Sequence, residues 1–135
     1  AVTAIANDQM GRGGIACAGA NGSGLANCIP DSPGDTSTMG PATSDGWASA
    51  TVKGFAYSLD DANSTVTEAF SYGGAGFSAR QFPDAAASES PQSIFTDNTV
   101  ADNDNLYICY RSIISASQAA GNYENYVTYT ATATF

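Results

Sequence analysis

The chain has 135 residues, with 13 acidic against 4 basic side chains, a net charge of −9 and no histidine. This length suffices for a single domain with its own hydrophobic core. The four cations (Arg12, Lys53, Arg80 and Arg111) are scattered, so we expect no basic patch for nucleic acid, and no stretch reaches the ~20 apolar residues of a membrane span.

The composition favours a secreted protein. Ala, Ser, Thr, Gly, Asn and Asp are abundant and Lys, Glu and Leu are rare, which is typical of β-rich extracellular domains. The opening residues "AVTAIAND" contain no signal peptide, and Ala1 is the residue that cleavage after a small-residue site would leave. We therefore expect a mature, signal-peptide-processed protein located outside the cell or on its surface.

The first third of the chain is predicted to be mostly irregular. Residues 1–7 form a short apolar segment, and residues 8–46 are rich in glycine, proline, serine and aspartate, as expected of a long surface loop region. Gly11–Gly14 provide a flexible hinge after the first segment. Cys17 and Cys28 flank a Gly/Asn/Ser-rich stretch that lets their sulfur atoms meet, so we predict a disulfide between them and a free, buried thiol at Cys109.

Residues 47–135 carry the main strand signals. A strand over 47–59 with a bulge near Gly54 and a strand over 65–74 are predicted to form a hairpin. Shorter strands follow over 76–82 and 94–100, and a long central strand over 106–117. About seven or eight strands without a helical stripe predict one all-β domain, 1–135, folded as an antiparallel immunoglobulin-like β-sandwich.

The closing stretch "GNYENYVTYTATATF" alternates strictly, which is the period of a pleated strand with one buried face. This pattern predicts two sets of residues: Tyr123, Val127, Tyr129 and Phe135 facing the core, and Thr128, Thr130, Thr132 and Thr134 facing solvent or a neighbouring subunit.

The residues that enzymes use are mostly missing. Without histidine there is no imidazole base for a nucleophile and no histidine ligand for a metal. A carboxylate pair such as Glu68 with Asp60 or Asp61 is expected by chance among 13 acids. Asp102 and Asp104 in "ADNDN" favour a turn over a calcium loop. We therefore predict no catalytic, cofactor or metal site, and only two formal glycosylation sequons, at Asn21 and Asn63.

Both ends of the chain resemble a known family. "AAGNYENYVTYTATATF" looks like the last strand of chaperone-usher pilin subunits of the spore coat protein U type, and "AVTAIAND" is similar to the short extension that precedes the body of those subunits. The closing pattern also resembles immunoglobulin-like domains of other bacterial surface proteins. The pilin resemblance implies an incomplete sandwich whose groove is filled by the N-terminal extension of a neighbouring subunit.

The sequence thus predicts the structural subunit of an extracellular filament that polymerises by strand exchange. The residues expected at the subunit interface are Ala1, Val2, Thr3, Ala4, Ile5, Ala6 and Asn7. The alternative is a monomeric cell-surface adhesin or carbohydrate-binding module that uses Trp47 and exposed tyrosines as stacking platforms.

Overall fold

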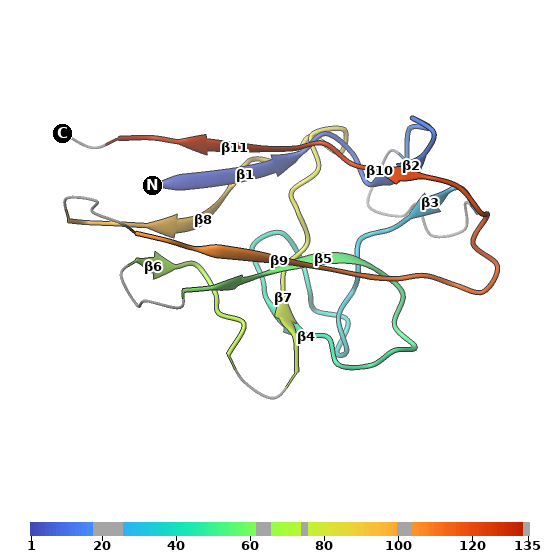
Figure 1. Ribbon diagram of the computed structural model, residues 1–135, viewed down its shortest axis with the longest axis horizontal. Coiled ribbons are helices and arrows are strands. Elements are labelled where there is room, and N and C mark those ends of the chain that lie inside the picture. The colour runs from blue at the N-terminus through green and yellow to red at the C-terminus, as the bar shows by residue number, and fades with distance from the viewer. Residues whose placement is uncertain (18–25, 62–65, 74–75, 100–103, 134–135) are drawn as a thin grey trace.

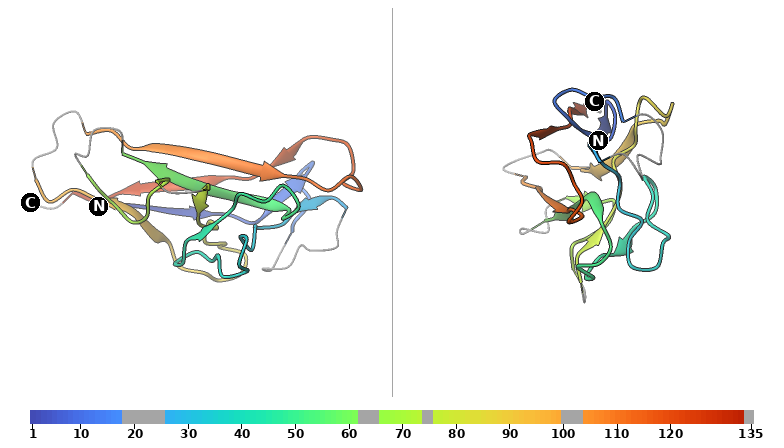
Figure 2. Two further views of the ribbon diagram at one scale, coloured as in Figure 1. Left: turned by 90° about the horizontal axis from the view of Figure 1, so that it is seen from below. Right: turned by 90° about the vertical axis from the view of Figure 1, so that its right-hand side faces the viewer.

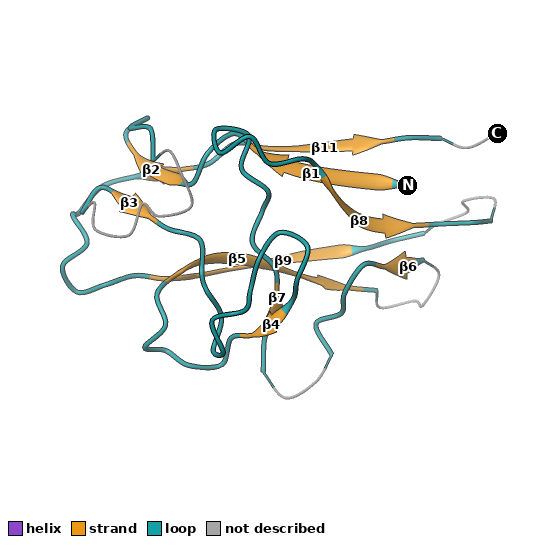
Figure 3. Ribbon diagram, turned by 180° about the vertical axis from the view of Figure 1, so that it is seen from behind, coloured by secondary structure: helices purple, strands orange, loops and turns teal. Residues whose placement is uncertain are grey.

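The computed structural model describes residues 1–17, 26–61, 66–73, 76–99 and 104–133, and within these ranges it contains strands and no helices (Figures 1 and 3). Five strands have five to seven residues, and six have two or three. The strands are β1 (Val2–Ala6), β2 (Met10–Arg12), β3 (Cys28–Ile29), β4 (Asp45–Gly46), β5 (Gly54–Asp60), β6 (Thr67–Glu68), β7 (Ser78–Ala79), β8 (Gln92–Thr96), β9 (Tyr107–Ile113), β10 (Tyr123–Glu124) and β11 (Val127–Ala131).

The strands pair antiparallel into four sheets. The largest has the order β11-β1-β8-β6, and it lies over the two-stranded sheet β5-β9 (Figure 2). A sheet of order β10-β2-β3 extends one end of the molecule, and the pair β4-β7 lies beyond β5 (Figure 1). The fold is therefore all-β and built from antiparallel sheets.

The main core lies between the four-stranded sheet and β5-β9. Ala4 and Ala6 of β1 and Ile94 of β8 contribute from one layer, and Phe55, Tyr57 and Leu59 of β5 contribute from the other. Phe82 completes the core, with its ring stacked 4.0 Å from that of Tyr57. Alternate β5 residues therefore face one layer, as the period of a strand requires.

A second core lies on the opposite face of β5. Trp47 is completely buried there with Met39, Ala56 and Ala79, and its indole N–H donates to the carbonyl oxygen of Val52 at 3.0 Å. The Arg111 guanidinium lies 5.1 Å from the Trp47 ring centroid, within cation–π range. Both faces of β5 are thus covered, and its residues from Gly54 to Leu59 are all buried.

Parts of the predicted strand arrangement are wrong. The expected hairpin of 47–59 with 65–74 does not form, because β5 begins only at Gly54 and pairs with β9, while β6 pairs with β8. The long strand predicted as central, β9, lies at the edge of its two-stranded sheet. The region 8–46, predicted to be rich in loops, contains the three short strands β2, β3 and β4. The immunoglobulin-like topology stays a prediction.

The closing strand follows its predicted register over most of its length. Tyr123 and Val127 pack against the main core, and Thr128, Thr130 and Thr132 are exposed. Tyr129 points to the same side as Val127, but 39% of its surface is exposed, because β11 is the edge strand of its sheet. Thr134 and Phe135 lie outside the described residues.

Candidate functional site

The predicted inter-subunit segment, residues 1–7, contains β1 and lies between β11 and β8 of its own chain (Figure 1). It pairs with β11 from Val2 opposite Ala131 to Ala6 opposite Val127. Ala1 continues this ladder, because its ammonium group donates to the carbonyl oxygen of Thr132 at 3.0 Å. The segment is an inner strand, and without it β11 would have no partner strand in the described chain.

The two faces of β1 differ in their surroundings. Val2, Ala4 and Ala6 face the main core, where Ala4 is 1% and Ala6 2% exposed. Thr3 and Ile5 point to the other face of the sheet and are half-buried. We call the position of β1 between β11 and β8 the β1 slot. Because two of the three core-facing side chains are methyl groups, much of the interaction between β1 and this slot comes from backbone hydrogen bonds.

The exit of β1 is fastened by backbone hydrogen bonds to two different segments. The Ala6 amide donates to the carbonyl oxygen of Pro83 at 2.8 Å, and the Ala85 amide donates to the carbonyl oxygen of Ala6 at 3.0 Å. The Asn7 amide donates to the carbonyl oxygen of Tyr126 at 2.9 Å. The chain therefore leaves the four-stranded sheet at a defined point before it reaches β2.

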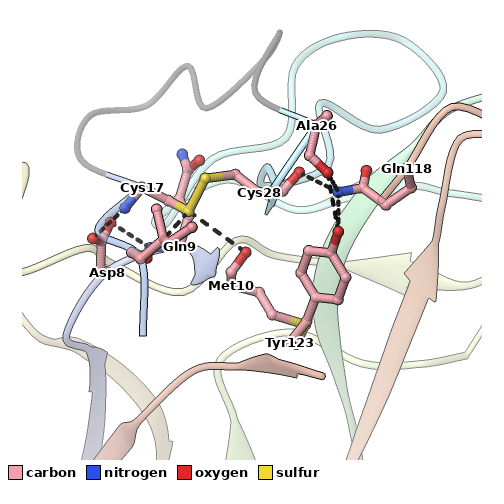
Figure 4. Close-up of a disulfide and its surroundings, with 9 residues drawn as sticks. Asp8, Gln9, Met10, Cys17, Ala26, Cys28, Gln118 and Tyr123 are labelled. Carbon is pink, nitrogen blue, oxygen red and sulfur yellow. Dashed lines mark hydrogen bonds between the residues drawn. A yellow bond between two sulfur atoms is a disulfide. The ribbon is translucent and has the colours of Figure 1, made fainter. Parts of the chain in front are cut away.

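The next segment is fixed by the predicted disulfide. Cys17 and Cys28 are bonded, with their Cα atoms 5.9 Å apart, and Cys109 is free, so both predictions are confirmed (Figure 4). The Cys109 thiol is half-buried rather than fully buried. The Cys17 amide donates to Oδ2 of Asp8 at 2.7 Å, which links the disulfide to the residues just after β1.

Polar side chains from the end of the chain brace the same region (Figure 4). The Gln118 amide group donates to the carbonyl oxygens of Ala26 and Cys28 at 2.8 and 3.0 Å. The Tyr123 hydroxyl donates to the carbonyl oxygen of Ala119 at 2.7 Å. The sheet β10-β2-β3 is therefore held by side chains as well as by its short ladders.

The flexible hinge predicted at Gly11–Gly14 is wrong. Gly11 belongs to β2, and a Cβ atom there would collide with the carbonyl oxygen of Ile15. Gly13 and Gly14 have φ values of 60° and 77°, so they form a left-handed turn that glycine accepts without strain. The connection between the two sheets is instead made by residues 7–9.

Four carboxylates gather around this connection, and the sequence did not reveal them because they are far apart in the chain. Asp84 is 3% exposed, and its Oδ1 accepts the Ala86 amide at 2.8 Å. Burial, together with the nearby charges of Asp84, Glu89 and Asp8, raises the pKa of Asp31 to about 7. Burial also raises the pKa of Asp84. At neutral pH this region therefore carries negative charge that the fold disfavours.

The remaining predicted sites give no functional cluster. Both sequons, Asn21 and Asn63, lie outside the described residues, as does Asp102. Within the described ranges, no group of three His, Cys, Asp or Glu side chains is arranged to hold a metal ion. Glu68 accepts the backbone N–H of Asp61 at 3.1 Å, an ordinary structural hydrogen bond.

The stacking platform assigned to Trp47 is wrong, because the indole is completely buried in the second core. Among the described residues, the exposed aromatic side chains are all tyrosines: Tyr72, Tyr107, Tyr110, Tyr126 and Tyr129. An aromatic ligand-binding surface would therefore depend on tyrosine alone.

Comparisons with known proteins identify no relative. No protein-family model, no characterised protein and no solved structure matches the chain. In the described part of the chain, no helix is long and apolar enough to cross a membrane.

Proposed function

We propose that this protein is the structural subunit of an extracellular filament, and that subunits are joined when β1 of one copy takes the place of β1 in the next. The observation that supports this proposal is the position of β1. It is an inner strand between β11 and β8, yet it belongs to a different sheet from β2, the strand that follows it. β1 and β2 can therefore be anchored in different molecules.

Exchange conserves the interactions of the slot. A neighbour's residues 1–7 would make the same ladder to β11, with Thr3 opposite Thr130 and Ile5 opposite Thr128. Each backbone hydrogen bond stabilises by about 1 kcal/mol net, and the same bonds are present before and after exchange. Because head-to-tail exchange does not close on itself, it produces a fibre rather than a dimer.

The residues that follow β1 would stay in place during exchange. β2 is paired with β3 and β10, and the disulfide between Cys17 and Cys28 closes this unit. To reach a neighbouring molecule, the chain would have to change its backbone direction only at residues 7–9, between β1 and β2. A disulfide is also typical of oxidising compartments, which supports a location outside the cell or on its surface.

The test compares the intact chain with one that lacks residues 1–7. We expect the intact chain to form filaments visible by negative-stain electron microscopy, and the shortened chain to form no filaments or to fold poorly. A synthetic peptide of sequence AVTAIAN should bind the shortened chain and raise its melting temperature. Filaments of unchanged appearance from the shortened chain would refute exchange through β1.

Two altered peptides test whether the added peptide occupies the β1 slot. Ala4→Asp places a carboxylate in the main core, where Ala4 is 1% exposed, so this peptide should not bind. Thr3→Asp is the matched control, because Thr3 lies on the other face of the strand, and it should bind nearly as well as the unaltered peptide. Equal binding of both altered peptides would mean that the peptide does not occupy the β1 slot. A monomeric adhesin would form no filament with any of them.

A further inference from the structure

The side of the sandwich formed by β9 and β11 has two free strand edges. Among the described strands, β9 pairs only with β5 and β11 pairs only with β1. Both edges lie on the same side of the molecule, as the right-hand view of Figure 2 shows. Free edges are sites at which another strand can add to a sheet.

Hydrogen bonding on β5 determines which β9 residues point outward. The Phe55 amide donates to Pro30, the Tyr57 amide donates to Arg80, and the Leu59 carbonyl accepts from Tyr72. These three β5 residues therefore direct their backbone groups away from β9, and the β5 residues between them bond to β9. By register, the β9 residues left with outward N–H and C=O groups are Ile108, Tyr110 and Ser112.

Hydrogen bonding to β1 likewise determines which β11 residues point outward. Ala1 and Thr132 exchange two backbone hydrogen bonds, and Asn7 donates to Tyr126, so alternate β11 residues bond to β1. The residues with outward backbone groups are consequently Val127, Tyr129 and Ala131.

The middle residues of these two sets touch each other. The hydroxyl groups of Tyr110 and Tyr129 are 2.6 Å apart and share a hydrogen bond, so the centres of both free edges lie at the same level of the sandwich. Tyr110 is 53% exposed although its ring stacks 6.0 Å from that of Phe55. An aromatic stack from the main core thus reaches solvent between the two edges.

Neither edge carries the features that usually prevent association. Strand edges are commonly protected by lysine, proline, a bulge or an inward charge, whereas β11 has no charged residue and β9 has only Arg111. The Arg111 guanidinium donates to the carbonyl oxygen of Trp47 and is directed at the second core. Between Asn105 and Ala133 the only acidic residue is Glu124, in a chain with a net charge of −9.

We propose that a second copy of this chain docks on this side, related by a two-fold axis that is normal to both sheets and runs between the two copies at the level of Tyr110 and Tyr129. Tyr129 then lies opposite Tyr129 of the second copy, and Tyr110 opposite its own equivalent. Both sheets continue antiparallel across the interface, and outward backbone groups meet outward backbone groups along β9 and β11. A single axis can relate both pairs of edges, because the side chains of the central residues, Tyr110 and Tyr129, are in contact. This interface uses neither face of the β1 slot, so it does not depend on strand exchange.

Sedimentation equilibrium of the intact chain and two lysine variants tests the interface. After any filaments have been removed by centrifugation, the intact chain that remains in solution should associate to a dimer. Tyr129→Lys places two like charges directly opposite each other at the axis and should raise the dimer dissociation constant by at least about tenfold. Thr130→Lys is the matched control: it lies opposite Thr128 of the second copy, and its dissociation constant should change little. A monomeric intact chain, or equal effects of the two variants, would overturn the proposal.

Cysteine cross-linking provides a second readout that does not require loss of binding. In a Cys109→Ser background, Tyr129→Cys should form a disulfide between two copies when oxidised with copper phenanthroline, because Cα atoms of hydrogen-bonded partners lie about 5.5 Å apart. Thr130→Cys should not, since its equivalent in the second copy is diagonal to it, about 7–8 Å away. Circular dichroism of each variant verifies that it is folded. Equal cross-linking at both positions, or none at Tyr129→Cys in a folded variant, would refute the two-fold register.

Discussion

At the scale of single residues, the closing strand is the most direct test of the register. Val127→Asp would place a carboxylate against the main core without a partner, and should lower the free energy of unfolding by roughly 2–3 kcal/mol. Thr130→Asp changes an exposed residue three positions away, and should cost less than about 0.5 kcal/mol. Urea denaturation of both variants measures the difference, and similar losses would mean that the strand is rotated by one residue.

Asp31 is expected to make stability depend on pH. Its pKa is raised by burial and by nearby carboxylates from the ordinary 3.8 to about 7, so the folded state holds a proton that the unfolded state has released. The stability contributed by this group is therefore complete below about pH 4 and is lost as the pH rises to 7, by at most about 4 kcal/mol.

Replacing Asp31 by asparagine isolates this effect. Asp31→Asn should remove most of the stability difference between pH 5 and pH 8, as measured by urea denaturation at both values. An unchanged difference would assign the pH dependence to the other carboxylates around residues 7–9.

At the scale of elements, the disulfide is expected to stabilise one sheet more than the rest. Replacing Cys17 and Cys28 by serine opens a short loop and should cost about 3 kcal/mol in the chain-entropy model. Hydrogen exchange should show the largest loss of protection in β10-β2-β3, whose ladders have only two register pairs each. Cys109→Ser is the control and should leave exchange in that sheet unchanged. Uniform loss of protection in the double variant would contradict a local role.

The sequence predicted the existence of the longer strands better than their partners. Alternation of apolar residues indicates which face of a strand is buried, so the closing strand could be predicted from local sequence. The disulfide could also be predicted locally, because the stretch between its two cysteines is short and rich in glycine, asparagine and serine. Pairing depends on contacts between residues far apart, and β5 could not be matched to β9 by inspecting either stretch alone. The bulge predicted near Gly54 is wrong, because Gly54 is the first residue of β5. Its φ of 142° and its close approach to the Ser32 backbone explain why glycine occurs there. The carboxylates around residues 7–9 were missed because they come from three separate regions.

At the scale of the whole molecule, β5 connects the two cores. Tyr57 faces the main core and Ala56 faces the second, so neither core can come apart without disturbing the strand they share. We therefore expect a single cooperative transition. Trp47 is the only tryptophan and reports on the second core, so its fluorescence should change at the same denaturant concentration as far-UV circular dichroism. Two separate midpoints would show that the cores unfold independently.

The side-by-side position of Ala1 and Thr132 determines how the molecule responds to mechanical load. A pull applied at these two residues would open β1 from β11 like a zipper, because the first pair of hydrogen bonds carries the load alone before the next is strained. If β1 came from a neighbouring subunit, tension along the fibre would act parallel to the same strands and all pairs would share it. The same ladder of hydrogen bonds would therefore resist less force in an isolated subunit than in an assembled filament.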